Sequence, residues 1–127
     1  MKEETQTHLR RSRRLLAMVE ARVDVELPEV IAHTAYYAMY HAAIAVFAER
    51  NLPLPKTHSG VVARFSQLDR EASLGAKAEV ARLSRGLDRR LIADYNAEDL
   101  LTNAHARAAR EDAVAFVEFC ERVVGTS

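Results

Sequence analysis

The chain has 127 residues, which is enough for one domain but too few for a second hydrophobic core. Hydrophobic residues make up 49% and charged residues 28%, a balance typical of globular proteins, and this excludes a disordered chain. The formal net charge is zero, which excludes a uniformly basic polyanion binder, while local patches of charge stay open.

Apolar residues spaced three and four apart predict five helices and an all-α fold, beginning with a helix over Glu4–Arg22. A second helix is predicted over Pro28–Arg50, where the proline suits the first turn. This helix is apolar on most faces, so we expect it in the middle of a bundle or in an oligomer interface. A short third helix follows, with Thr57 or Ser59 as its N-cap.

The second half of the chain is predicted to contain two long helices. A polar connection over Asp69–Ser73 leads into a helix over Leu74–Asp94, and a loop over Asn96–Leu101 follows it. Thr102 is a suitable N-cap for the last helix, which Gly125 ends. The whole chain, residues 1–127, is therefore expected to form a single helical domain.

Arginines gather on two predicted helix faces. One group lies mostly off the apolar stripe of the first helix and is expected to be solvated, with contact to RNA as the alternative: Arg10, Arg11, Arg13 and Arg14. The other group shares a face of the fourth helix, at spacings i, i+3 and i+7: Arg82, Arg85 and Arg89.

Several classes of site and location are not expected. The single cysteine, Cys120, excludes an internal disulfide framework and a cysteine-based zinc site. His33 and His41 are eight residues apart on one predicted helix without acidic residues at ligand spacing, so neither a metal nor a cofactor is expected. The N-terminus lacks the apolar stretch of a signal peptide, and the apolar stretch over Val30–Ala48 reads as a buried helix, not a membrane span. Cytoplasmic residence is the expectation.

Three segments carry more specific information. They are Tyr36–Ala43 (YYAMYHAA), Lys56–Val62 (KTHSGVV) and Arg90–Tyr95 (RLIADY). In this order and spacing they resemble the HEPN family, in particular its small bacterial and archaeal branch. The resemblance covers the chain from about Val30 to Val124.

The resemblance implies a bundle of four long antiparallel helices plus a shorter one, usually paired as a homodimer. Many relatives are metal-independent ribonucleases in which an arginine is followed, four to six residues later, by a histidine. The arginine binds the scissile phosphate, and the histidine moves protons to and from the ribose hydroxyl. Some relatives pair with a nucleotidyltransferase in toxin–antitoxin modules, where a tyrosine after the histidine can be modified.

This chain departs from that pattern, because none of its arginines is followed by a histidine at the required distance. Asp94 stands where the histidine is expected, and Tyr95 follows it directly. An aspartate has an ordinary pKa of about 3.9, so at neutral pH it is a poor acid, and its charge repels a phosphate. Standard ribonuclease activity is therefore not expected. Arg90 and Asp94 are spaced to form an ion pair on the helix surface.

Three functions follow as alternatives. The first is an interaction module that binds a nucleotidyltransferase-type partner, a nucleotide or RNA through residues at the end of the fourth helix and His58. The second is an active endoribonuclease toxin, with Arg90 and Asp94 as its catalytic residues. The third is a structural dimer without a ligand.

The predicted ligand-binding residues are Arg89, Arg90, Asp94, Tyr95 and His58. The predicted dimer interface consists of Tyr36, Tyr37 and Tyr40. These rings are expected to pack in the core and the dimer, with a platform for stacking bases as the alternative.

Overall fold

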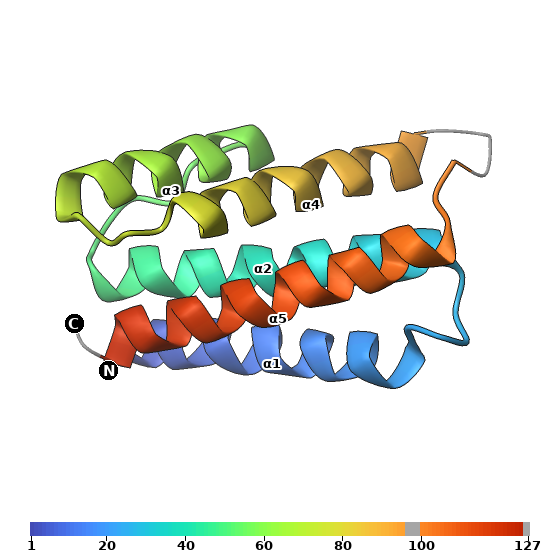
Figure 1. Cartoon of the computed structure of the whole chain (residues 1–127). Helices are drawn as coiled ribbons and strands as arrows, with labels where there is room; N and C mark the ends of the chain where they lie inside the picture. The colour runs from blue at the N-terminus through green and yellow to red at the C-terminus, as the bar shows by residue number, and fades with distance from the viewer. Residues whose placement is uncertain (96–99, 126–127) are drawn as a thin grey trace.

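The protein is an all-α bundle of five helices in the computed structural model, which describes residues 1–95 and 100–125 (Figure 1). The helices are α1 (Glu3–Arg22), α2 (Pro28–Glu49), α3 (His58–Ala72), α4 (Lys77–Tyr95) and α5 (Asn103–Gly125). The described ranges contain no strand. The predicted fold of four long helices plus a shorter one is therefore confirmed, and α3, with 15 residues, is the shorter one.

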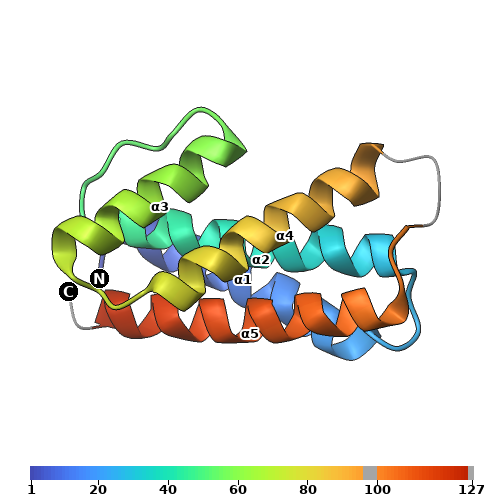
Figure 2. The same ribbon diagram turned by 45° about the horizontal axis from the view of Figure 1, so that its top comes forward.

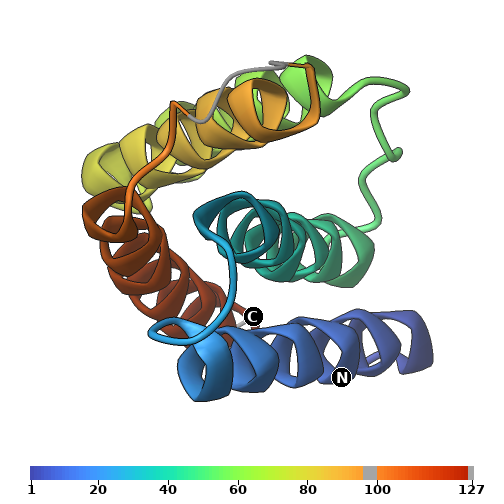
Figure 3. The ribbon, with the colours of Figure 1, turned by 90° about the vertical axis from the view of Figure 1, so that its right-hand side faces the viewer.

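The four long helices alternate in direction along the chain, while α3 runs in the same direction as α2 (Figures 1 and 2). Seen along the bundle, α2 lies in the middle, with α1, α5 and the α3–α4 pair around it (Figure 3). By length and composition α2 is apolar enough to cross a membrane, but 67% of its most apolar window is buried inside the bundle. Its central position accounts for its apolar character.

Aromatic rings join three helices in the core. Phe65 of α3 lies between Phe47 of α2 and Phe116 of α5, with ring centroids 6.4 and 5.1 Å apart. The three rings are fully buried, so α3 is attached to the bundle mainly through apolar contact. A polar contact joins α1 to α2, where the buried Ser12 hydroxyl donates to the Ala38 carbonyl at 2.7 Å.

The absence of a side chain at Gly86 brings α4 close to α2. A Cβ atom at this position would overlap the terminal methyl of Met39, which is fully buried, and would also touch the Tyr36 ring. Because Arg90 lies about one turn further along α4, this close approach places its side chain against α2.

The connection between α3 and α4 differs from the prediction. The residues expected as a polar connection are helical as far as Ala72, and Ser73 then adopts the left-handed conformation with φ 51°. The Asp69 carboxylate accepts a hydrogen bond from the Ala76 amide at 2.8 Å, so a residue that reads as a turn former instead links the two helices. Consequently α4 begins at Lys77 and not at Leu74. The predicted loop over Asn96–Leu101 lies mostly outside the described residues.

Thr57 is the N-cap of α3, and its hydroxyl accepts a hydrogen bond from the Gly60 amide at 2.9 Å. We expect Thr57→Ala to lower the free energy of unfolding by about 1 kcal/mol, because the amide loses its acceptor. Urea denaturation measures the change. The control is Ser59→Ala, the other predicted cap, and equal losses in the two variants would contradict the assignment of the cap to Thr57.

Candidate functional site at the α2–α4 end of the bundle

The candidate site centres on Arg90 and Asp94, one turn apart on α4. Arg90 Nε lies 3.0 Å from Asp94 Oδ2, as the i, i+4 spacing predicts. The Arg90 Nε–H is buried without an aligned acceptor, so the contact is an ion pair and not a straight hydrogen bond. The Arg90 side chain is only 15% exposed. Its guanidinium lies over the Tyr37 ring, 5.7 Å from the ring centroid, within the range of a cation–π contact.

A histidine from α2 completes this group. The Nδ1 atom of His33 lies 3.0 Å from Asp94 Oδ1, so the two carboxylate oxygens of Asp94 face different partners. The spacing of His33 in the sequence excludes it as a metal ligand and points to no other role for it. Folding across 61 residues therefore brings an imidazole to the carboxylate that occupies the expected histidine position.

His58 reaches the same region from the start of α3. Its Nδ1 atom lies 2.8 Å from the Tyr36 hydroxyl, and its ring contacts Tyr36, Tyr37 and Tyr40 at centroid distances of 5.0 to 5.7 Å. Burial, and then the Arg90 charge, lower the pKa of His58. A neutral imidazole at pH 7 can accept the hydrogen bond from the Tyr36 hydroxyl. Burial raises the pKa of Tyr36, so that hydroxyl keeps its proton.

The three tyrosines differ in accessibility. Tyr36 is fully buried inside the chain, so its side chain offers no surface to a second copy, contrary to its assignment to a dimer interface. Tyr37 and Tyr40 are partly buried. Tyr37 lines a surface hollow together with Leu15, His33, Thr34 and His41, and Asp94 lines a neighbouring one with Glu29, Val30, His33 and Thr34. The site therefore opens to solvent along one side of α2, between α1 and α4.

A pair of histidines, His8 of α1 and His41 of α2, lies beside the tyrosine rings of α2. The Nδ1 atoms of His8 and His41 are 3.0 Å apart, and the rings lie nearly parallel with centroids 5.2 Å apart. A hydrogen bond between these two nitrogens requires that one ring carries its proton on Nδ1 and that the other ring does not. Burial, followed by the His8 and Arg11 charges, lowers the pKa of His41 to about 4. Among the described residues, no group of three or more His, Cys, Asp and Glu could hold a metal ion.

The His41 environment makes stability depend on pH. Because the folded pKa lies below the ordinary 6.5, folding excludes a proton from His41, so stability falls as the pH drops from 7 towards 4. We expect a loss of about 1 kcal/mol between pH 7 and pH 5, after discounting for partial exposure. The urea midpoint should fall less steeply with decreasing pH in His41→Asn than in the parent protein. His105→Gln, at an exposed histidine, is the control, and a His41→Asn variant with the parent's slope would contradict the prediction.

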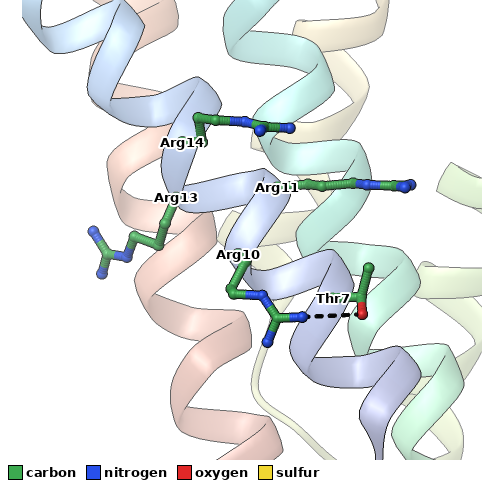
Figure 4. A pocket seen from close by; sticks show the side chains of 5 residues that line it. All are labelled: Thr7, Arg10, Arg11, Arg13 and Arg14. Atoms are coloured by element: carbon green, nitrogen blue, oxygen red, sulfur yellow. Dashed lines mark hydrogen bonds between the residues drawn. The ribbon is translucent and has the colours of Figure 1, made fainter.

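The arginines of α1 point in different directions (Figure 4). Arg13 extends towards α5 and pairs with Glu121, whereas Arg11 and Arg14 extend over the side that faces α2. Arg10 donates to the Thr7 hydroxyl at 3.3 Å. This face is solvated as expected, and it borders the candidate site through the His8–His41 pair. Burial is the main cause that lowers the pKa values of both histidines, and the Arg11 charge lowers them further.

One residue of the predicted ligand-binding set, Arg89, lies apart from the others. Arg89 is turned away from Arg90 and donates to Asp112 of α5 at 2.7 Å, together with two other arginines of its face. Tyr95 is 77% exposed at the last position of α4. The structure therefore brings Arg90, Asp94 and His58 together around Tyr37 and adds His33, while Arg89 belongs to a different surface.

Comparison with known proteins agrees with the resemblance found in the motifs. The family model described as HEPN domain matches residues 5–123, which include α2, α3 and α4 and therefore the whole candidate site. A UPF0332 protein from Archaeoglobus fulgidus is 28% identical over 122 residues, which cover 96% of this chain and 96% of that protein.

Proposed function

Because this chain belongs to the HEPN domain family, we propose that it is a HEPN module without the usual arginine–histidine ribonuclease pair. In this proposal it binds a protein partner of nucleotidyltransferase type through the end of α4 that carries Arg90, Asp94 and Tyr95. The resemblance to HEPN proteins of toxin–antitoxin modules suggests the class of partner. Action in the cytoplasm is part of the same proposal.

The observation that carries this proposal is the contrast between a covered cation and exposed apolar side chains. Arg90 is 15% exposed and paired with Asp94, so its charge is already offset by a carboxylate, which weakens its attraction for an incoming phosphate. Around it, Val30, Leu91 and Tyr95 are 43%, 41% and 77% exposed. Leu91 and Tyr95 share one face of α4, and Val30 lines the same hollow as Asp94. Exposed apolar and aromatic groups with a polar rim suit a protein interface.

Co-expression with the product of the neighbouring open reading frame tests the proposal. We expect the two proteins to co-elute in size-exclusion chromatography, and we expect Tyr95→Ala to weaken the complex at least tenfold, since an exposed aromatic anchor is lost. Arg70→Ala, on α3, is the control because it removes an exposed side chain that lies outside the site. Separate elution of the two parent proteins contradicts the proposal, as does a Tyr95→Ala complex of unchanged affinity.

A homodimer is part of the same proposal. The open side of α2 carries the partly buried Tyr37 and Tyr40, which a second copy could cover. Light scattering is expected to report a dimer at micromolar concentration, and Tyr37→Ser is expected to shift it towards monomer. A monomeric parent protein contradicts this part. If the structural dimer is the whole function, Arg90→Ala leaves function intact while Tyr37→Ser abolishes it.

The contact between His33 and Asp94 favours a second candidate, a metal-independent endoribonuclease. A carboxylate that holds one nitrogen of an imidazole fixes the orientation of the ring, and the other nitrogen can then exchange a proton with the ribose hydroxyl. Arg90 would offset charge on the phosphate. RNA cleavage is expected to fall at least a hundredfold in both His33→Ala and Arg90→Ala. Absence of cleavage by the parent, or equal cleavage by the variants, eliminates this candidate.

A further inference from the structure

Three arginines of α4 converge on one carboxylate of α5. Asp112 Oδ1 accepts hydrogen bonds from Arg82 and Arg85, each at 2.9 Å. Asp112 Oδ2 accepts from Arg85 Nε at 3.3 Å and from Arg89 at 2.7 Å. Arg85 therefore binds both oxygens, with Arg82 and Arg89 on either side of it. The Asp112 side chain is 7% exposed, so this is a built contact at the α4–α5 interface and not a chance surface pair.

The cluster carries more positive than negative charge. Among the residues that the structure describes, Asp112 is the one carboxylate within ion-pair distance of the three guanidiniums. Its single charge leaves two positive charges uncompensated at one place, in a chain whose formal net charge is zero. Like charges held this close repel one another, and a second anion beside Asp112 would reduce that repulsion.

The cluster also has unused hydrogen-bond donors. Each guanidinium has five N–H groups, and Asp112 accepts four hydrogen bonds from the three arginines together. The Nε–H of Arg82 is buried and has no acceptor among the described residues. Arg85 and Arg82 are 51% and 30% exposed, so their remaining donors can be reached from solvent. The cluster thus combines charge, donors and access.

We propose that the arginine cluster of α4, formed by Arg82, Arg85 and Arg89, binds a phosphate-type oxyanion on the outer surface of the α4–α5 pair. A phosphate dianion matches the two uncompensated charges, and the planar guanidinium groups suit its oxygens in a bidentate arrangement. The anion lies beside Asp112 and accepts from the outward N–H groups of Arg85 and Arg82. No covalent step is involved.

This site is separate from the candidate site around Arg90. Arg89 and Arg90 are consecutive on α4, so their side chains leave the helix about 100° apart around its axis. Arg89 faces α5, whereas Arg90 lies over Tyr37 of α2. Binding of an anion at this site therefore does not depend on the partner-binding function proposed above.

Titration of the folded protein with inorganic phosphate, at constant ionic strength and pH 7.5, tests the proposal. Calorimetry is expected to show saturable binding at one site, and NMR is expected to show shifts in the Nε–H signals of Arg82 and Arg85. Arg85→Gln is expected to weaken binding at least tenfold because it removes a charged donor, and Arg85→Lys is expected to retain part of the affinity. The matched control Arg70→Gln, at an exposed arginine outside both sites, is expected to bind as the parent does.

A second titration, with adenosine monophosphate and with adenosine, distinguishes a phosphomonoester from free phosphate as the ligand. If the monophosphate competes with phosphate and adenosine does not, the site takes phosphomonoesters. If phosphate alone binds, the site takes the free anion. The proposal is overturned if neither anion binds, if Arg85→Gln binds as tightly as the parent, or if Arg90→Gln abolishes binding while Arg85→Gln does not.

Discussion

Asp112→Asn is expected to lower the free energy of unfolding by about 3 kcal/mol. The variant keeps the shape of the side chain but leaves three guanidiniums without a counter-charge at the α4–α5 interface. Breaking a buried ion pair on one side costs about 3 to 5 kcal/mol, and the lower value is expected here because Arg85 is half exposed.

Urea denaturation at pH 7 measures this loss, and Glu111→Gln is the matched control. Glu111 is the exposed neighbour of Asp112 on α5, so its substitution should change stability by less than about 0.5 kcal/mol. A loss below about 1 kcal/mol for Asp112→Asn would show that the arginines do not need the carboxylate.

The pH dependence of the stability of Asp112→Asn provides a second test. Burial alone would raise the pKa of Asp112, but the hydrogen bonds and charges of Arg85 and Arg89 outweigh it and lower the pKa below the ordinary 3.8. A carboxyl with a lowered folded pKa stabilises the fold above its unfolded pKa, and this contribution is lost as the pH falls further. Stability of the parent is therefore expected to drop below about pH 4, and Asp112→Asn should lack this part of the drop.

Phe65→Ala is expected to lower the free energy of unfolding by about 3 to 4 kcal/mol, since it leaves a cavity between Phe47 and Phe116. The ring is fully buried and is the largest of the buried side chains of α3. Because His58 is the first residue of α3, weaker packing of this helix also displaces an imidazole from the candidate site.

Two measurements separate these effects. Urea denaturation gives the loss of stability, and NMR titration of the His58 ring follows its position, because burial and Arg90 lower the pKa of His58 in the parent. In Phe65→Ala the pKa of His58 is expected to rise towards its ordinary 6.5. The control Phe65→Leu keeps most of the volume and should lose less stability while preserving the His58 pKa. A destabilised Phe65→Ala variant with an unchanged His58 pKa would contradict the link between core and site.

The sequence by itself determined the helices and the family. Helical spacing of apolar residues is a local property of the chain, so it predicted five helices, which the structure confirms. The ion pair between Arg90 and Asp94 was predictable for the same reason, because both residues lie on one helix four positions apart. Local patterns do not predict the exposure of a side chain where contacts between distant segments decide it. Leu91 lies one turn beyond Leu87 at the same helical spacing on α4, yet Leu91 is 41% exposed whereas Leu87 is buried.

Only the tertiary structure decided what surrounds Arg90 and what Arg89 binds. His33 and Asp94 are 61 residues apart, and nothing in the spacing of either residue points to the other. Asp112 is a single acidic residue on the buried face of α5, and its role depends on the way α4 packs against that face. Tyr36 and Tyr37 are adjacent in a motif, yet one is fully buried and the other lies at the surface of the site. Periodicity reports which residues face inward, but the partner of each polar group depends on the relative position of whole helices, which the packing of side chains from several segments sets together.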